Sequence, residues 1–338
     1  MSCGVRNIAL AMVMMLSVAG CSWGILSHKQ TDENSVLEST VNVTNATHWI
    51  NILSDDSMRG RFTPSEELNL AADIIARQFQ NIGLEPGVSN SYIQRYTIFD
   101  ELEAPNVVGI LRGSDPELKN EYVAFSAHMD HIGTGLAIKG DPIYNGADDN
   151  ASGTSAVILI ATAMKSLKVR PRRSMIFILV SGEERGLLGS KWFVEHPTVP
   201  LDAIVADLNI DMIGRNKSNR IAVIGKQLSS LGNVTDTIAY ENPDLGLVAI
   251  DDPWPEERLF FRSDHYSFAV HGIPSIFFFA GIHEDYHMPS DEADKINFEM
   301  TTRIARFIAL TGLNVANAKN RPKWNKKAYD EIIKTKLF

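Results

Sequence analysis

The sequence predicts an α/β sandwich with a largely parallel central sheet. Along most of the 338 residues, short apolar runs typical of strands alternate with longer runs of helical periodicity. This alternation is the pattern of a sheet covered by helices. Carboxylates and histidines also recur directly after the apolar runs, and open α/β sheets place their ligand sites at the carboxyl ends of their strands. The chain is long enough to bury a sizeable core.

The first predicted helix begins at Thr63. Thr63 can act as the N-cap, Pro64 takes the first helical position and Glu66 completes a capping box. Apolar residues then recur on one face as far as Phe79. Gly83 suits the position just beyond a helix end. We therefore expect a helix between Thr63 and Gly83.

The later elements follow from the same periodicities. Strands are expected over 106–111, 122–127, 174–180, 203–210, 221–224 and 275–280. Helices are expected over 152–167, 186–195, 229–240 and 298–313. The run at 174–180 is apolar on both faces, which predicts a central strand. Residues 249–262 are expected to form a loop in which Trp254, Phe260 and Phe261 either pack on the body or wall a substrate pocket.

The first residues have the pattern of a secretion signal. Arg6 precedes an apolar run of the length of a signal peptide, too short to span a bilayer with confidence. Small residues then lead into Cys21, which resembles the lipobox of bacterial lipoproteins, whose cysteine is acylated after cleavage. We expect a signal peptide over 1–20 and a lipidated tether over 21–47. The resemblance implies a membrane anchor in the bacterial cell envelope, on the outer membrane facing the periplasm. An ordinary signal peptide and an uncleaved anchor are the alternatives.

Composition excludes some classes of partner. The net charge is -9, and no basic patch interleaved with aromatic residues indicates a nucleic-acid partner. The only other cysteine, Cys3, would leave with the signal peptide, so neither a disulfide nor a cysteine-based metal site is expected. The basic segment 319–338 is expected to be a solvated tail. Trp324 and Tyr329 are its only indications of contact with lipid head groups.

Asp148 and Asp149 stand side by side in the turn 145–153, just before a predicted helix. Two adjacent carboxylates are electrostatically costly unless a cation or several donors meet them. The N–H groups of the helix start can satisfy some of the oxygens. The turn alone is compatible with an ordinary Asx-rich turn and with a metal site.

Five separated positions carry side chains that suit a metal ion: His128, Asp149, Glu184, Asp211 and His287. Each one alone could be a helix cap or a hydrogen-bonded core residue. A parallel sheet would gather their strand ends at one edge. Together, and without cysteine, they predict a metal site made of imidazole and carboxylate.

The order and local sequence of these residues resemble the motifs of the M28 family of co-catalytic zinc aminopeptidases. The resemblance covers about residues 60–315, and it implies a three-layer α/β/α sandwich with a mostly parallel mixed sheet in a peptidase domain over 48–318. The matching segments are His128-x-Asp130, Gly146–Gly153, Gly182-Glu183-Glu184-x-Gly186, Asn209-Ile210-Asp211, Arg262-Ser263-Asp264-His265 and Tyr286-His287-x-x-x-Asp291.

The resemblance also implies two Zn²⁺ ions per chain. His128 and Asp211 would hold one ion, Glu184 and His287 the other, and Asp149 would bridge both. A bridging carboxylate allows two dications to lie ~3.5–4 Å apart.

Further roles are implied for the residues around the metals. Glu183 would be the general base, and Tyr286 would donate to the developing oxyanion or simply pack beside the site. Asp130 and Asp291 would accept the free ring N–H groups of His128 and His287. Asp264 would hold the ammonium group of the substrate or support the metal ligands.

The function implied is hydrolysis of N-terminal residues from peptides with a free N-terminus, by a water that bridges two zinc ions. One alternative is a glutaminyl-cyclase-like acyltransferase of the same fold, which resembles a single-zinc design. Another is a non-catalytic binding lipoprotein, which would be expected to have damaged ligands. All five ligand positions are intact in this sequence.

Overall fold

The computed structural model describes residues 32–99, 101–215 and 219–334. The predicted signal peptide, Cys21 and the start of the predicted tether lie outside these residues, so the lipid anchor stays a prediction. None of the helices in the described part of the chain combines the length and the apolar character needed to cross a bilayer.

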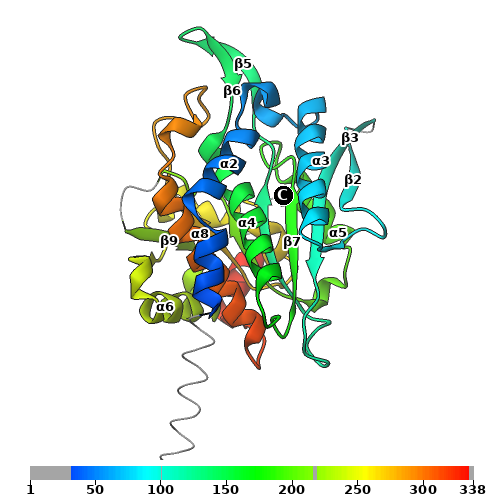
Figure 1. Ribbon diagram of the computed structural model, residues 1–338, viewed down its shortest axis with the longest axis vertical. Helices are drawn as coiled ribbons and strands as arrows, with labels where there is room; N and C mark the ends of the chain where they lie inside the picture. The colour runs from blue at the N-terminus through cyan, green and yellow to red at the C-terminus, as the bar shows by residue number, and fades with distance from the viewer. Residues whose placement is uncertain (1–31, 100, 216–218, 335–338) are drawn as a thin grey trace, which may run out of the picture.

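A mixed sheet of nine strands forms the centre of the described chain (Figure 1). Its strands are β1 (Glu85–Pro86), β2 (Ile93–Ile98), β3 (Leu102–Leu111), β4 (Tyr122–His128), β7 (Ser174–Val180), β8 (Ile204–Ile210), β9 (Arg220–Ile224), β10 (Val248–Ile250) and β11 (Ser275–Phe279). They follow the order β1-β3-β7-β4-β8-β11-β9-β10, with β2 paired to β3. The neighbours β7, β4, β8 and β11 are parallel, whereas β3 and β9 run antiparallel to them. The predicted central strand at 174–180 is β7.

Helices cover both faces of the sheet. One face carries α2 (Val43–Leu53), α3 (Glu66–Asn81), α4 (Gly153–Ser166), α6 (Leu231–Glu241) and α8 (Phe298–Asn317). In Figure 1, α2, α3 and α4 lie in front of the strands. The other face carries α5 (Leu188–Glu195) and α7 (His265–Ala269). There Phe193 and Phe268 pack with ring centroids 5.8 Å apart over the strands. The three-layer α/β/α sandwich is therefore confirmed.

The first predicted helix starts later than expected. Ser65 is its N-cap, and the Ser65 hydroxyl accepts the backbone N–H of Leu68 at 3.0 Å. Thr63 is buried instead, where its hydroxyl donates to Asp130 and accepts from the backbone N–H of Gly182, both at 3.0 Å. Thr63 thus links two strand ends rather than capping a helix.

The tether prediction is wrong for residues 32–47. Residues 32–40 are helical, and α2 follows directly. Leu37, Val41, Ala46, Ile50 and Leu53 are buried, most of them in the core shared with α4 and α8. Their spacing of three to five residues gives one apolar face, which the polar residues between them obscure in the sequence.

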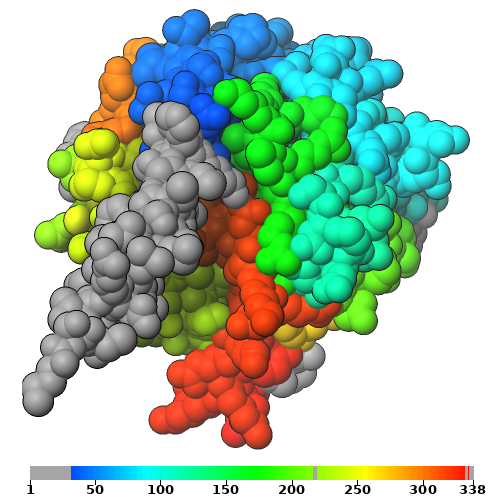
Figure 2. Space-filling model, turned by 60° about the horizontal axis from the view of Figure 1, so that its bottom comes forward, coloured from blue at the N-terminus to red at the C-terminus, as the bar shows by residue number. Residues whose placement is uncertain are grey.

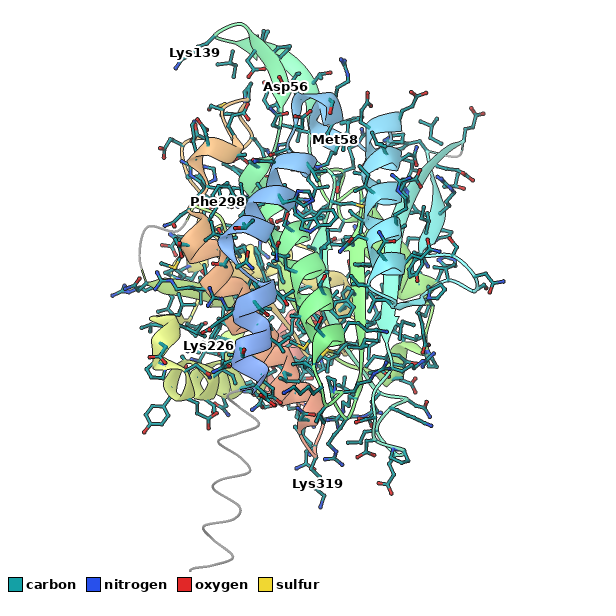
Figure 3. All side chains as sticks on the ribbon, viewed as in Figure 1. Asp56, Met58, Lys139, Lys226, Phe298 and Lys319 are labelled. Atoms are coloured by element: carbon teal, nitrogen blue, oxygen red, sulfur yellow. The ribbon has the colours of Figure 1, made fainter. Side chains whose placement is uncertain are left out.

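A hairpin that the sequence did not predict follows β4. It consists of β5 (Gly133–Ile138) and β6 (Asp141–Tyr144), which pair antiparallel. Figure 3 shows Lys139 at its tip, pointing away from the body, with Asp56 near its base. The hairpin marks the end of the molecule toward which β4 runs.

The C-terminal segment contains the helix α9 (Lys326–Lys334). In Figure 2 it projects from the body in red, and most of its described residues are exposed. The segment before this helix nevertheless contacts the body at several points, among them an ion pair of Arg321 with Glu121 at 2.9 Å and a hydrogen bond from the backbone N–H of Asn325 to the carbonyl of Leu228 at 2.8 Å. The indole N–H of Trp324 donates to the carbonyl of Gly272 at 3.0 Å, and its ring stacks on Tyr329.

Candidate metal centre

The four parallel strands deliver the predicted metal ligands to one edge of the sheet. β4 ends at His128, and Asp211 directly follows β8. Glu184 follows β7, and His287 lies in the loop after β11. Asp149 lies in the turn before α4, which packs against β4. All five predicted ligands therefore meet.

The first group of ligands consists of three buried residues. His128 Nε2 lies 3.3 Å from Asp211 Oδ1 and 3.4 Å from Asp149 Oδ1. All three residues are buried, and their ligand atoms lie within 4.8 Å of one another. This group could hold one metal ion.

The second group uses the other oxygen of Asp149. His287 Nε2 lies 3.2 Å from Asp149 Oδ2 and 3.2 Å from Glu184 Oε2. Asp149 thus presents Oδ1 to one group and Oδ2 to the other. This is the placement expected for a bridging carboxylate.

His131 joins the second group, although the sequence did not predict it as a ligand. Its Nδ1 lies 2.9 Å from Glu184 Oε1 and 3.7 Å from Asp149 Oδ2, and its side chain is fully buried. The signal available in the sequence was its place three residues after His128, in the same strand-end segment.

The donor set fits zinc. Imidazole nitrogen and carboxylate oxygen bind Zn²⁺ at about 2.0–2.2 Å, which in a tetrahedron places ligand atoms about 3.3 Å apart. The distances above cluster around this value. Moreover, both ring nitrogens of His131, Nε2 of His287 and Oε1 of Glu184 are buried without a hydrogen bond to any described residue. Buried polar atoms normally have a partner, and a metal ion would supply it.

The electrostatics of the cluster also favour a cation. Burial lowers the pKa of His128, but Asp211, Asp130 and Asp149 outweigh this and raise it well above its ordinary value. Burial likewise opposes the charge on His287, yet the carboxylates of Asp149 and Glu184, each 3.2 Å from its Nε2, raise its pKa to about 10. The carboxylates thus hold positive charge strongly, whether it comes from protons or from metal.

Asp130 lies beside His128, as predicted. His128 Nδ1 is 3.2 Å from the backbone carbonyl of Asp130 and 3.7 Å from its carboxylate Oδ1. The carboxylate also accepts the Thr63 hydroxyl. The backbone carbonyl oxygen and the carboxylate Oδ1 of Asp130 both face the His128 ring and can fix its orientation. The carbonyl oxygen is the nearer of the two.

Asp291 has a different partner from the predicted one. In the described structure its carboxylate accepts the backbone N–H groups of Asp148 and Asp149 at 3.0 Å, rather than the ring N–H of His287. The reason is that the turn carrying Asp149 leaves its own amides unpaired, and Asp291 satisfies them. Asp291 therefore positions the shared carboxylate through the backbone.

Asp148 does not face the metal groups. It accepts the backbone N–H of Gly214 and the hydroxyl of Ser152, and its Oδ2 lies 3.1 Å from His283 Nε2. Three donors thus offset the cost of placing Asp148 beside Asp149.

Glu183 and Tyr286 line one cavity together with Asp149 and Asp211. The Tyr286 ring stacks on His287 with centroids 3.9 Å apart. Burial raises the pKa of Glu183 well above its ordinary value, and nearby carboxylates add to this against the opposing effect of His128. Burial also raises the pKa of Tyr286. Both predicted catalytic side chains are therefore next to the ligands.

Asp264 is not placed to hold a substrate. It is completely buried and does not line the cavity. Burial raises the pKa of Asp264 to about 7. Its neighbour Ser263 donates to Asp211 Oδ2 at 2.9 Å. Of the two predicted roles for Asp264, only support of the ligands from behind agrees with this position.

The aromatic residues of the predicted loop pack on the body. The ring centroids of Trp254 and Phe279 are 5.7 Å apart, and those of Phe260 and His265 are 4.8 Å apart. Phe261 contacts Tyr266 at 5.3 Å. The wall of the cavity is made instead by Met212, Leu259, Phe277, Phe279 and Ile282, with Arg262 as its one basic residue.

Two aminopeptidases of known structure share this architecture. The LapA aminopeptidase of Legionella pneumophila matches with a TM-score of 0.67 at 20% identity, over 86% of this chain and 76% of that one. BSAP, a zinc aminopeptidase from Bacillus subtilis, matches with a TM-score of 0.52 at 25% identity, over 63% of this chain and 50% of that one. The chain therefore has the α/β/α fold of the zinc exopeptidases.

The family follows from the sequence itself. The sequence model of peptidase family M28 matches residues 106–312, and the chain belongs to this family. Aminopeptidase YwaD of Bacillus subtilis (strain 168) is 26% identical over 240 residues, which are 68% of this chain and 48% of that protein. The chain spans about half the length, or less, of the curated relatives it matches first.

Proposed function

We propose that this chain is an aminopeptidase that removes N-terminal residues from peptides with the help of two zinc ions. The observation that carries the proposal is the sharing of Asp149 between two ligand groups, at 3.4 Å from His128 and 3.2 Å from His287, beside a cavity that also contains Glu183. The family and the zinc aminopeptidase BSAP support the same chemistry.

The residues around the cavity have distinct tasks in this proposal. When bound, two zinc ions would lower the pKa of a water molecule and polarise the scissile carbonyl. Glu183 takes the proton of the attacking water and returns it to the leaving amine. Tyr286 donates a hydrogen bond to the oxygen on which negative charge develops. Asp130 and Asp291 keep His128 and Asp149 in place.

The side chain of the first substrate residue would be apolar. Six of the ten residues that line the cavity are aliphatic, aromatic or methionine side chains, among them Leu259, Phe279 and Ile282. Burying an apolar side chain against this wall is favourable, whereas an acidic side chain would meet the carboxylates of the lining, and the one basic residue, Arg262, already pairs with Glu257 at 3.2 Å. We therefore propose a preference for leucine-like residues over acidic ones.

We also propose that the protein is anchored through Cys21 in the outer membrane and faces the periplasm. The small residues before Cys21 and the apolar run before them support this location. Cells that express Cys21→Ala should lose the protein from the membrane fraction. A variant that still sediments with outer membranes after salt washing would contradict the anchor.

The direct test is cleavage of leucine p-nitroanilide by the full chain purified in mild detergent. We expect cleavage that a chelator abolishes and zinc restores, and no cleavage of the N-acetylated substrate. Two zinc ions per chain should accompany full activity. Cleavage that persists in chelator would contradict the proposal. One zinc per chain together with cyclisation of N-terminal glutamine would instead favour the acyltransferase alternative.

A further inference from the structure

We propose that His131 is an additional metal ligand, at the same metal position as Glu184 and His287. That position would then have four protein groups, whereas the position at His128 has three. The inference rests on the proposed two-metal function, which it extends by naming a ligand and an asymmetry between the two positions.

Glu184 lies between two imidazole rings. Its Oε1 is 2.9 Å from His131 Nδ1, and its Oε2 is 3.2 Å from His287 Nε2. The same rings face Asp149 Oδ2 at 3.7 Å and 3.2 Å. The ring centroids are 5.6 Å apart and the ring planes cross at 72°. Both histidine rings thus face the carboxylates of Asp149 and Glu184 from different directions, as ligands of one ion do.

The His131 ring is held in this orientation by its surroundings. The backbone N–H of His131 donates to the carbonyl of Arg61 at 3.3 Å. On the other side is Gly146, where a Cβ atom would lie 2.5 Å from the ring carbon Cγ of His131. Gly146 also has a φ of 60°, so a side chain there would be strained as well. The backbone of the turn that carries Asp149 therefore packs closely against the His131 ring.

A purely structural role does not account for the ring nitrogens. A core histidine normally has at least one ring nitrogen in a hydrogen bond, because an unpaired buried polar atom is costly. Within the described residues, neither nitrogen of His131 makes a hydrogen bond of good geometry. The one close approach is that of Nδ1 to the carboxylates that would bind metal. Coordination through Nδ1 satisfies this atom.

The proposal predicts that the two metal positions differ. A position with four protein groups resembles a closed structural site, whereas one with three keeps room for water or substrate. Of the ligands that belong to one position alone, Asp211 at the three-group position lines the cavity, whereas His131 is completely buried and does not line it, although His287 beside it is half-buried. The ion at His131 should therefore be retained longer, and the ion at His128 should exchange first.

Counting coordinated imidazoles tests the proposal without an activity assay. In the full chain loaded with two equivalents of Co²⁺, proton NMR should show three hyperfine-shifted ring N–H signals, from His128, His131 and His287. The variant His131→Ala should lose one of them. The control His271→Ala, which removes an exposed imidazole bonded to Ser267, should keep all three. Two signals in the fully loaded wild-type protein would overturn the proposal, even if the variant failed to fold.

Competition with a chromophoric chelator provides a second readout. His131→Ala should raise the Kd of the more tightly held ion by at least ~10-fold, since even groups that only hydrogen-bond a ligand contribute ~10–100-fold. His271→Ala should leave both constants unchanged. An unchanged tight constant in His131→Ala would contradict the proposal. Two bound ions and normal cleavage with only two ring signals would leave the proposed function standing and remove this inference alone. One bound ion with two ring signals, from His131 and His287, would remove the two-zinc function and leave the assignment of His131 standing.

Discussion

Arg61 lies against Gly146, and its Nη2 donates to the Gly146 carbonyl at 3.0 Å. The same guanidinium donates to the carbonyl of Asn145 and, through Nε, to that of Met129, each at 2.8 Å. The Arg61 side chain is fully buried, and burial lowers its pKa to about 10, so it stays charged at neutral pH. One cation thus ties the segment after His128 to the turn of Asp149.

Replacing this cation should loosen the site. In Arg61→Met these three carbonyls and that of Leu53, to which Nη1 also donates, would lose their donor, and each buried unpaired group costs about 1–3 kcal/mol. We expect the free energy of unfolding to fall by about 3–5 kcal/mol, measured by urea denaturation of the zinc-loaded protein. Arg59→Met is the matched control, because Arg59 is exposed and its contact with Glu67 should contribute less than about 1 kcal/mol. Equal stability of both variants would contradict this account.

Tyr286 is expected to act on the transition state rather than on substrate binding. Tyr286→Phe keeps the ring that stacks on His287 and removes only the hydroxyl. We expect kcat to fall about 100-fold with little change in KM, as is typical when one oxyanion donor is lost. Steady-state kinetics on leucine p-nitroanilide measure this. A normal kcat would mean that the ring only packs beside the site.

The apolar wall should be visible in substrate preference. We expect kcat/KM for the leucine substrate to exceed that for alanine about 10-fold or more, because a larger apolar side chain gains about 1–3 kcal/mol in such a pocket. Glutamate p-nitroanilide should be poorest. Ile282→Ala, at an exposed position of the wall, should reduce the ratio of kcat/KM for the leucine substrate to that for the alanine substrate. An enzyme that cleaves the glutamate substrate as well as the leucine one would rule out an apolar pocket.

Asp207 should make stability depend on pH. It is fully buried in β8, where Ser126 donates to its Oδ1 at 2.7 Å, and burial raises its pKa well above its ordinary value. The folded chain therefore keeps a proton that the unfolded chain loses above about pH 4. Its contribution to stability is full below that pH and declines as the pH rises toward the folded pKa.

The side chain in Asp207→Asn does not titrate, so this position no longer makes the free energy of unfolding depend on pH. At pH 8 we expect the variant to be more stable than wild type by about 1–3 kcal/mol, and at pH 4 nearly equal to it. Urea denaturation at the two pH values, with metal load matched, measures the difference. Asp202→Asn, at an exposed position, is the control. A gain in stability at pH 8 no larger than at pH 4 would show that Asp207 is charged in the folded protein.

Periodicity and strand ends predicted six of the nine strands and the five ligand positions because both are local signals, whereas β1, β2 and β10 were not predicted. The run at 174–180 is apolar throughout, and Glu184 follows it within one short segment. The helix at 43–53 was missed because polar residues separate its buried positions. The cap at Ser65 was missed because Thr63 carries the same chemistry two residues earlier.

His131 and Arg61 could not be assigned from the sequence, because their partners lie far away in the chain. His131 meets Glu184 only when β4 and β7 lie side by side, as their parallel pairing places them. Arg61 meets Asn145 and Gly146 across more than eighty residues. The place of His131 three residues after His128 marks it only as a strand-end histidine, and Arg61 has no such signal, so the contacts themselves are visible only in the tertiary structure.

The central claim, a metal-dependent peptidase in which Glu183 moves the proton, is tested most directly by Glu183→Gln. The amide keeps the shape of the side chain and cannot take a proton. We predict that kcat for leucine p-nitroanilide falls by at least about 10³-fold while two zinc ions per chain remain bound. Glu195→Gln, an exposed change on α5, should leave both quantities unchanged. Undiminished cleavage by Glu183→Gln with full metal content would contradict the account.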